Sequence, residues 1–378
     1  MLTLNRMLMI GSAGANVGKT ELACSLLERY AKDNEIIGIK VTTIKQRDGQ
    51  CPRGGAGCGV CSSIDGDFDI FQETDTSSGK DTARLLGAGA KKVYWLRVMQ
   101  THLKQGIEAL LDIIGPDSIT VCESNSLRKI VEPGLFLMVK RLGRQEVKES
   151  AAAVIKYADK IVVSDGSSFD LDLDRIILSA DKWILRHDAT AVILAGGKSG
   201  RMGTDKSLLP IKDRSMVETI YLQLCDKFDQ VLISANEPGK FSFLESRVVP
   251  DKVAGQGPLM AIASALEASK SELNFVIACD IPFIDIGFVK IMLAEAHESG
   301  ADIVVPVSGG DKFEPLFAVY SRSCLKAINE VLLEGGRRIS DIFNKCDVRF
   351  IELKADRFAN LNTRAEYEQF RAKYNNDI

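Results

Sequence analysis

The stretch that decides the fold is Val192–Lys206, VILAGGKSGRMGTDK, near the middle of the chain. With Ala191, its first three residues form an apolar run that predicts a buried strand. The loop that follows gathers four glycines and three cations: Gly196, Gly197, Gly200, Gly203, Lys198, Arg201 and Lys206. A lone Gly-Gly pair would indicate only a surface turn. Glycines let backbone N–H groups approach a ligand, and such groups with nearby cations bind phosphate oxygens, so this loop predicts a phosphate site in an open α/β sheet.

The loop resembles the signature LAGG-x-S-x-RMG-x-DK of the molybdenum cofactor guanylyltransferases and matches it at every fixed position. Related nucleotidyltransferases share a looser form, so the loop identifies the superfamily more firmly than the substrate. The resemblance implies that the backbone of the strand end seats the guanosine of GTP: Leu194, Ala195, Gly196 and Gly197. It also implies that Arg201 and Lys206 hold the β- and γ-phosphates and stabilise the leaving pyrophosphate.

Three polar residues after the loop complete the expected nucleotide site. Asp280 ends the apolar strand Phe275–Cys279, where a carboxylate can hold the Mg²⁺ that bridges nucleotide phosphates. The guanylyltransferases have their metal-binding aspartate in a matching D-x-P-F context, although Asp280 could instead cap the next helix. Asn236 follows a strand, where a side-chain amide could meet the base or ribose of the nucleotide. Asp251 lies in a segment resembling the family's PD…GxGPLAGI, which implies that it helps to recognise the guanine nucleotide. The alternative for Asp251 is a turn aspartate.

Candidate acceptor-binding residues lie near the C-terminus. Arg338 in GGRRISDIF fits a phosphate of the acceptor, since arginine forks bind phosphate bidentately, or else it belongs to a solvated helix start. Asn360 and Asn362 in FANLNTRAEY resemble the family's N-x-NTPE-like residues, with Arg364 replacing the usual proline.

A second phosphate loop opens the chain. After an apolar strand at Met7–Ile10, GSAGANVGKT ends in Gly18, Lys19 and Thr20, the GK[ST] end of a P-loop. The lysine would reach terminal phosphates and the threonine would hold Mg²⁺. The pattern departs at Ala13, where glycine is usual, and a chance GKT opening a helix is the alternative.

The segment that follows resembles the small P-loop partner of the guanylyltransferase. Its GKDT…AGA sequence, Gly79–Ala90, matches the GKDS…AGA segment of that partner, which is thought to bind GTP and to assist guanylyl transfer. Later strands at Ile119–Cys122 and Ile161–Ser164 end before Glu123 and Asp165. Either carboxylate could poise Mg²⁺ or water, or cap a loop, and the sequence does not choose between them.

A polar insertion in the first half contains CPRGGAGCGVC, with Cys51, Cys58 and Cys61. Three thiolates in a glycine-rich loop suit zinc or an iron–sulfur cluster, but no fourth ligand is evident. A redox-active or persulfide-type thiol and unremarkable loop thiols are the alternatives.

The overall composition bounds the remaining possibilities. A chain of 378 residues predicts two domains, residues 1–187 as a P-loop GTP-binding domain with the cysteine-rich insertion and 188–378 as a nucleotidyltransferase domain. Both are expected to be three-layer αβα folds, P-loop NTPase-like and Rossmann-like respectively. The net charge of −3 argues against nucleic acid binding. The longest N-terminal apolar run is too short for a membrane span. Nine cysteines without an export signal favour the reducing cytoplasm.

The sequence therefore predicts an enzyme that transfers GMP from GTP to molybdopterin with Mg²⁺, assisted by the P-loop domain. Expected partners are GTP, molybdopterin, molybdopterin-synthesis proteins and the molybdenum or tungsten apo-enzymes that receive the product. Two alternatives stay open: a cytidylyl or sugar-phosphate nucleotidyltransferase using the same loop, and a GTP-dependent carrier or adaptor for cofactor delivery.

Overall fold

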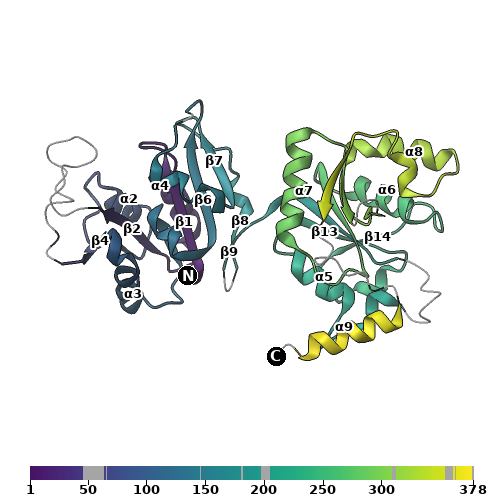
Figure 1. Ribbon diagram of the computed structural model, residues 1–378, viewed down its shortest axis with the longest axis horizontal. Helices are drawn as coiled ribbons and strands as arrows, with labels where there is room; N and C mark the ends of the chain where they lie inside the picture. Colours follow the sequence, from purple (N-terminus) through teal and green to yellow (C-terminus); the bar gives the residue numbers. More distant parts are fainter. Residues whose placement is uncertain are drawn as a thin grey trace. The chain divides into compact units, whose positions relative to one another are not determined.

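The computed structural model describes residues 1–45, 64, 66–144, 146–179, 182–196, 205–308, 312–353, 361 and 363–376. The chain separates into two compact units, Met1–Leu185 and Arg186–Ile378, each built on its own sheet (Figure 1). Helices cover both faces of each sheet, which confirms the predicted α/β architecture. Within the described ranges, no helix is long and apolar enough to cross a membrane.

The sheet of the first unit has seven strands in the order β3-β4-β2-β5-β1-β6-β7. Its strands are β1 (Leu2–Ser12), β2 (Ile37–Ile44), β3 (Phe68–Glu73), β4 (Lys92–Met99), β5 (Thr120–Glu123), β6 (Val131–Arg141) and β7 (Lys160–Ser164). Neighbouring strands are parallel except β3, which runs antiparallel to β4, so the sheet is mixed. A short hairpin of β8 (Ile176–Leu178) and β9 (Trp183–Leu185) ends the unit.

The side chains of β1 show why this sheet has a layer on each face. Leu8 and Ile10 pack in the core with α1 (Lys19–Tyr30) and α2 (Asp81–Gly87). Met7 and Met9 point to the opposite face, under α3 (Leu103–Ile114) and α4 (Glu149–Ala152). All four are essentially inaccessible to solvent, and burying such a side chain stabilises the fold by about 1.5–3 kcal/mol.

The second unit has an eight-stranded sheet in the order β14-β13-β10-β15-β18-β16-β17, with β19 paired to β16. Its strands are β10 (His187–Leu194), β13 (Phe228–Ser234), β14 (Arg247–Val249), β15 (Leu273–Ala278), β16 (Ile303–Ser308), β17 (Lys312–Phe313), β18 (Phe317–Ser321) and β19 (Val348–Leu353), with a separate ribbon of β11 (Pro210–Ile211) and β12 (Arg214–Ser215). Strands β10, β13 and β15 are parallel neighbours, whereas β18 runs antiparallel between β15 and β16.

Alternating residues of β10 again define two helical layers. Ala191 and Ile193 pack with α5 (Met216–Leu224), α7 (Ile286–Ser299) and α9 (Arg364–Asn376). Val192 and Leu194 pack on the opposite face with α6 (Pro258–Ala268) and α8 (Leu325–Leu333). Helix α5 begins with a capping box that satisfies its first N–H groups.

The register of the central strands positions the site. Leu194, the last residue of β10, lies beside Ser234 of β13 and Ala278 of β15. The signature loop, Asn236 and Asp280 therefore all leave the sheet at one edge. That edge, at the carboxyl ends of parallel strands, is where open α/β sheets bind ligands.

Candidate active site

The signature loop begins where β10 leaves the sheet. Leu194 and Ala195 are buried, and the amide of Ala195 donates to the carbonyl of Ser234 at 3.0 Å. A Cβ on Gly196 would lie 3.5 Å from the backbone of the neighbouring strand end, so the chain passes close to β13 there. Gly197 and Arg201 lie outside the described residues.

Two predicted catalytic residues, Lys206 and Asp280, lie in one place. The ammonium Nζ of Lys206 is 3.7 Å from Oδ2 of Asp280. Leu361 links both: its amide donates to the carbonyl of Asp280 at 2.9 Å, and its carbonyl accepts from Lys206 Nζ at 3.1 Å. The side chains of Lys206 and Asp280 keep 20% and 23% of their exposure, so both groups are partly desolvated yet reachable by a ligand.

Burial dominates the electrostatics of Asp280. Burial raises the pKa of its carboxyl above the ordinary value, although the charge of Lys206 acts to lower it. The carboxylate of Glu314, which is itself 7% exposed, adds to the rise in the pKa of Asp280. Burial also raises the pKa of the adjacent Cys279 thiol to about 12, which makes that thiol a poor nucleophile at neutral pH.

The residues present fit Mg²⁺ that arrives with a nucleotide. Mg²⁺ in such sites is usually held by one or two carboxylates together with substrate phosphates. Asp280 is a desolvated carboxylate with a second buried carboxylate, Glu314, in its field, so a cation there would relieve the cost of its charge. Over the described residues, no group of three or more His, Cys, Asp or Glu side chains is arranged to hold a metal ion.

Asn236 and Asp251, both predicted to contact guanosine, pair with each other. The amide Nδ2 of Asn236 donates to Asp251 Oδ2 at 2.9 Å, and the backbone N–H of Asp251 donates to Asn236 Oδ1 at 2.8 Å. The next segment opens α6 through Gly255 and Gly257, which have φ of 79° and 78°. Only glycine adopts such conformations readily, so this turn accounts for the GxG spacing.

Asp205, a residue of the signature loop for which no role was predicted, is structural. Oδ1 of Asp205 accepts from the amide of Ser207 at 2.9 Å and caps the short helical turn Lys206–Leu208. The other oxygen of Asp205 forms an ion pair with Lys240. Asp205 therefore orients the turn that presents Lys206. An aspartate directly before a lysine was the available signal, because aspartate is a favoured cap.

Of the three candidate acceptor residues, the structure describes only Arg338. Arg338 is exposed at the start of the turn Ile339–Ile342, and its amide donates to Asp341 at 3.1 Å. Asn360 and Asn362 lie outside the described residues. Leu361, between them in sequence, is the residue that contacts both Lys206 and Asp280.

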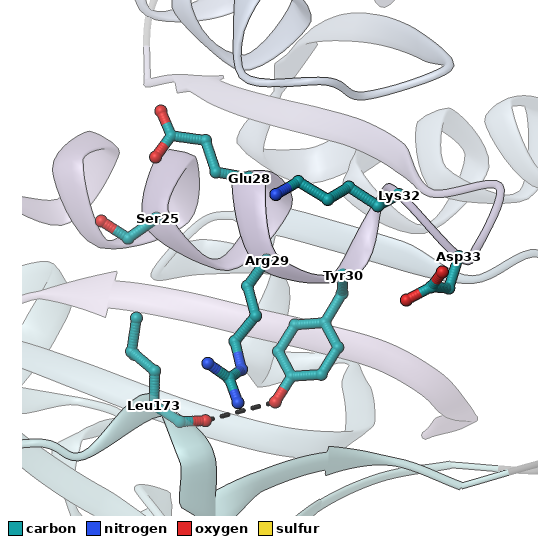
Figure 2. A pocket seen from close by; sticks show the side chains of 7 residues that line it. All are labelled: Ser25, Glu28, Arg29, Tyr30, Lys32, Asp33 and Leu173. Atoms are coloured by element: carbon teal, nitrogen blue, oxygen red, sulfur yellow. Dashed lines mark hydrogen bonds between the residues drawn. The ribbon is translucent and has the colours of Figure 1, made fainter.

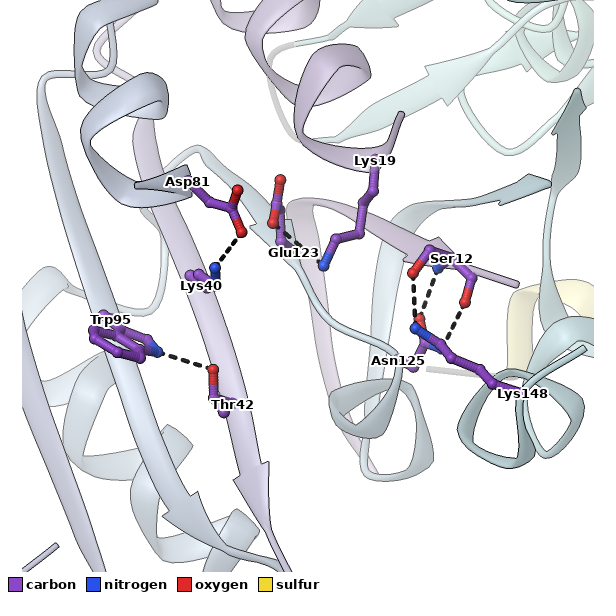
Figure 3. Close-up of polar contacts among 9 residues, drawn as sticks. All are labelled: Ser12, Lys19, Lys40, Thr42, Asp81, Trp95, Glu123, Asn125 and Lys148. Carbon is purple, nitrogen blue, oxygen red and sulfur yellow. Dashed lines mark hydrogen bonds and ion pairs between the residues drawn. The ribbon is translucent and has the colours of Figure 1, made fainter. Parts of the chain in front are cut away.

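The predicted P-loop residues lie at the start of α1 in the first unit. Gly18 has φ of 95° and precedes the first turn of α1, where no side chain caps the free N–H groups. A helix N-terminus of this kind favours anions. Lys19 extends to β5, with Nζ 3.2 Å from Oε2 of the fully buried Glu123, and Thr20 is also buried (Figure 3). Ala13, the departure from the pattern, is accommodated with 2% exposure.

Further polar contacts around this loop were not predicted. Asn125 Oδ1 accepts from the amide of Ser12 at 2.8 Å, and Lys148 Nζ donates to the hydroxyl of Ser12 at 2.9 Å (Figure 3). On the other side of the loop, Lys40 forms an ion pair with Asp81. Burial raises the pKa of Asp81, but the hydrogen bond and charge of Lys40 outweigh burial and lower it.

Other features of the first unit stand apart from this site. Cys51, Cys58 and Cys61 lie outside the described residues. Asp165 is an exposed turn residue: hydrogen bonds from Ser167 and Ser168 lower the pKa of its carboxyl, so it caps a loop. An open hollow of about 660 Å³ lies beside the end of α1, lined by residues of both charges (Figure 2). None of the predicted site residues lines it.

Comparison with known proteins assigns the second half of the chain to a family. Residues 191–348 match the model of the MobA-like NTP transferase domain. The probable molybdenum cofactor guanylyltransferase of Natranaerobius thermophilus is 37% identical over 198 residues, which are 49% of this chain and 95% of that protein. The molybdenum cofactor guanylyltransferase of Syntrophotalea carbinolica is 32% identical over 190 residues, covering 48% of this chain and 90% of the relative.

A solved structure is also similar. The crystal structure of molybdopterin-guanine dinucleotide biosynthesis protein A from Archaeoglobus fulgidus aligns with a TM-score of 0.44 and 21% identity, over 49% of this chain and 97% of that one. The sequence relatives are matched along nearly their whole length by the segment that carries the signature loop, Lys206 and Asp280. Through its C-terminal half, the chain therefore belongs to the MobA-like NTP transferase family and is a nucleotidyltransferase.

Proposed function

We propose that the chain transfers GMP from GTP to molybdopterin, giving molybdopterin guanine dinucleotide and pyrophosphate. The observation that carries the proposal is the 3.7 Å separation of Lys206 and Asp280, which come from segments far apart in sequence. Together they offer a cation for phosphates and a carboxylate for Mg²⁺ at the edge where β10 and β15 end. The relatives named as guanylyltransferases support the choice of GTP and molybdopterin.

The reaction needs no nucleophile from the protein. A phosphate oxygen of the acceptor attacks the α-phosphorus of GTP, a new P–O bond forms, and the bond to pyrophosphate breaks with its electron pair on the leaving group. Catalysis then depends on positioning and on charge stabilisation. Lys206, with Arg201 of the same loop, stabilises the charge that grows on the leaving pyrophosphate. Mg²⁺, held by Asp280, would neutralise charge on the nucleotide phosphates.

The remaining site residues bind and orient the two substrates. The backbone of Leu194, Ala195, Gly196 and Gly197, with Asn236 and Asp251, seats the guanosine. The mutual hydrogen bonds of Asn236 and Asp251 fix both side chains before the nucleotide arrives, which reduces the entropy cost of binding. Arg338, Asn360 and Asn362 bind the acceptor, and Leu361 supports this placement because its backbone contacts Lys206 and Asp280.

We further propose that residues 1–187 form a P-loop domain that binds GTP and assists the transfer carried out by residues 188–378. The position of Lys19 beside the buried Glu123, at the start of α1, supports phosphate binding there. Gly18, Lys19 and Thr20 would grip the phosphates, with Thr20 on Mg²⁺. Delivery of the product to molybdenum or tungsten apo-enzymes by this half is the alternative function.

A transfer assay on the full chain tests the proposal. Pyrophosphate release is measured with GTP or CTP, with and without molybdopterin. We expect release only with GTP and acceptor together, and its loss in Asp280→Asn. Asp226→Asn is the matched control, since Asp226 also pairs with a lysine at 3.0 Å and is similarly exposed. Preference for CTP would instead support the cytidylyltransferase alternative.

The second candidate, a GTP-dependent carrier, is favoured by the separate phosphate site around Lys19. Lys19→Ala separates the two functions of the halves. Because the first half is proposed to assist the transfer, we expect the rate of guanylyl transfer to fall in this variant. If transfer survives while activation of a molybdenum apo-enzyme falls, the first half is instead an accessory module for delivery.

A further inference from the structure

The first unit carries an aromatic and cationic surface beside its phosphate loop. Register across the sheet puts Phe71 of β3 opposite Trp95 of β4, and Trp95 opposite Lys40 of β2. Residues paired in this way share a face of the sheet. With Arg97, two residues beyond Trp95 in the same strand, they form what we call the shelf: Lys40, Phe71, Trp95 and Arg97.

The shelf lies where helical cover of this face ends. Val93 of β4 has the same side-chain direction as Trp95, and it is fully buried in the core under α1 and α2. Two residues later Trp95 is partly exposed, and Phe71 is 47% exposed. A sheet between two helical layers normally continues with apolar residues along such a row. The exposed ring of Phe71, the partly exposed ring of Trp95 and the partly exposed Lys40 leave part of this row accessible to a ligand.

The flat groups of the shelf are held in fixed orientations. The indole Nε1–H of Trp95 donates to Thr42 Oγ1 at 2.9 Å (Figure 3). The guanidinium of Arg97 is 4.8 Å from the centroid of the Phe71 ring and 5.5 Å from that of Trp95, and Asp69 binds it at 2.9 Å. The side chain of Arg97 is only 7% exposed. Surfaces of this kind, aromatic with an arginine plane, stack flat rings.

Each cation of the shelf is paired with a carboxylate. Arg97 pairs with Asp69, and Lys40 pairs with Asp81. Because each cation already has a carboxylate partner, the shelf does not select an anion. It offers both donors and acceptors around flat faces, which suits a neutral heteroaromatic ring whose edge carries amide and amino groups.

The shelf continues directly into the phosphate site. Lys40 of β2 is paired in register with Glu123 of β5, and Lys19 of the P-loop reaches that same Glu123 (Figure 3). A P-loop lysine binds the terminal phosphates of a nucleotide. Since Lys19 points toward β5 and so toward the shelf, a terminal phosphate held by Lys19 would face the shelf, and the base of that nucleotide would lie away from it.

We propose that the shelf binds a second ligand, a neutral fused-ring heterocycle of the purine or pterin class, stacked on Trp95 and Phe71 beside the terminal phosphate of a P-loop nucleotide. The inference stands apart from guanylyl transfer in the second unit, because it concerns binding alone and is measured without turnover.

Tryptophan fluorescence of the full chain reads this site directly. The chain has two tryptophans, and Trp183 is fully buried whereas Trp95 is partly exposed. The chain is titrated with neopterin and, separately, with guanosine, both uncharged, in the absence and presence of saturating Mg²⁺ and GDP. We expect saturable quenching with and without GDP, and the tighter of the two probes identifies the pterin or the purine as the source of the ring.

Three variants make the test specific. Trp95→Phe should abolish the quenching, since only Trp183 then emits, while anisotropy of the neopterin signal shows that binding persists. Phe71→Ala should raise the Kd about tenfold through loss of one stacking face. Ile113→Ala, which changes another exposed side chain of the same unit, should leave it unchanged.

Several results would overturn the proposal. These are absence of saturable quenching, equal quenching in Trp95→Phe, and an unchanged Kd in Phe71→Ala when its thermal unfolding matches wild type. Quenching of Trp95 by GDP alone, with exclusion of neopterin, would show that the shelf holds the base of the nucleotide itself.

Discussion

Replacement of Lys206 by methionine is the perturbation whose size follows most directly from the structure. Methionine keeps the length and apolar stem of lysine but removes the ammonium. In the protein that ammonium lies 3.7 Å from Asp280 and is 20% exposed, so it acts in a partly desolvated site. Two unit charges about 4 Å apart interact by about 4 kcal/mol at the effective dielectric constant of such a site.

If Lys206 meets a unit of charge that develops on the leaving pyrophosphate, its loss raises the barrier by up to that amount. Each 1.36 kcal/mol is a factor of ten in rate, so kcat should fall about 10³-fold. Losses of about 10²–10³-fold are typical when one preorganised electrostatic contact is removed from an active site. The assay is the initial rate of pyrophosphate release at saturating Mg²⁺, GTP and molybdopterin.

Lys227→Met is the matched control. Its side chain is 23% exposed, it pairs with Asp226 at 3.0 Å, and it lies before β13, at the amino ends of the strands and away from the site. We expect kcat of this variant within threefold of wild type. The reasoning is refuted if folded Lys206→Met also stays within threefold of wild type.

Three further predictions concern stability as well as activity. Burial raises the pKa of Asp280, so its ionised form destabilises the fold above that pKa. Asp280→Asn should therefore raise the Tm at pH 7.5 while abolishing transfer. This gain in Tm should shrink as the pH falls toward about 4, where the carboxyl of the unfolded chain also protonates. Lys19→Ala leaves the buried Glu123 without its ion-pair partner and should lower the free energy of unfolding in urea by about 3 kcal/mol. Adding Glu123→Gln should restore most of that stability. A double variant as unstable as Lys19→Ala would contradict the pairing. A Cβ at Gly134 would lie 1.9 Å from the backbone of β1, so Gly134→Ala should lower the free energy of unfolding by at least about 3 kcal/mol. Gly87 has open space around it, so Gly87→Ala should change the free energy of unfolding by less than about 1 kcal/mol. Similar melting curves for the two variants would contradict the packing.

Much of the C-terminal unit could be predicted because its signals are local. The apolar run before Gly196 specifies a buried strand. The strand ending at Asp280 directed that carboxylate to the same sheet edge as Lys206, and the structure places them together. Each of these features depends on side-chain type within one segment.

Other features could not be predicted because they depend on distant backbone. Leu361 joins Lys206 to Asp280 through its amide and carbonyl, and any residue type could supply those groups. Strand β6 contains Pro133-Gly134, which reads as a turn signal, yet the glycine is needed because β1 passes against it. The antiparallel direction of β3 and the register that aligns Phe71, Trp95 and Lys40 likewise arise only from the assembled sheet.

The central claim is that the signature loop and Asp280 act on one nucleotide. The most direct measurement is a crystal structure of the full chain with Mg²⁺ and a non-hydrolysable GTP analogue. The account predicts a nucleotide in the second unit, with its phosphates within hydrogen-bond distance of Lys206 Nζ and its Mg²⁺ on the carboxylate of Asp280. A nucleotide of the second unit that leaves either residue without contact to phosphate or metal would contradict it.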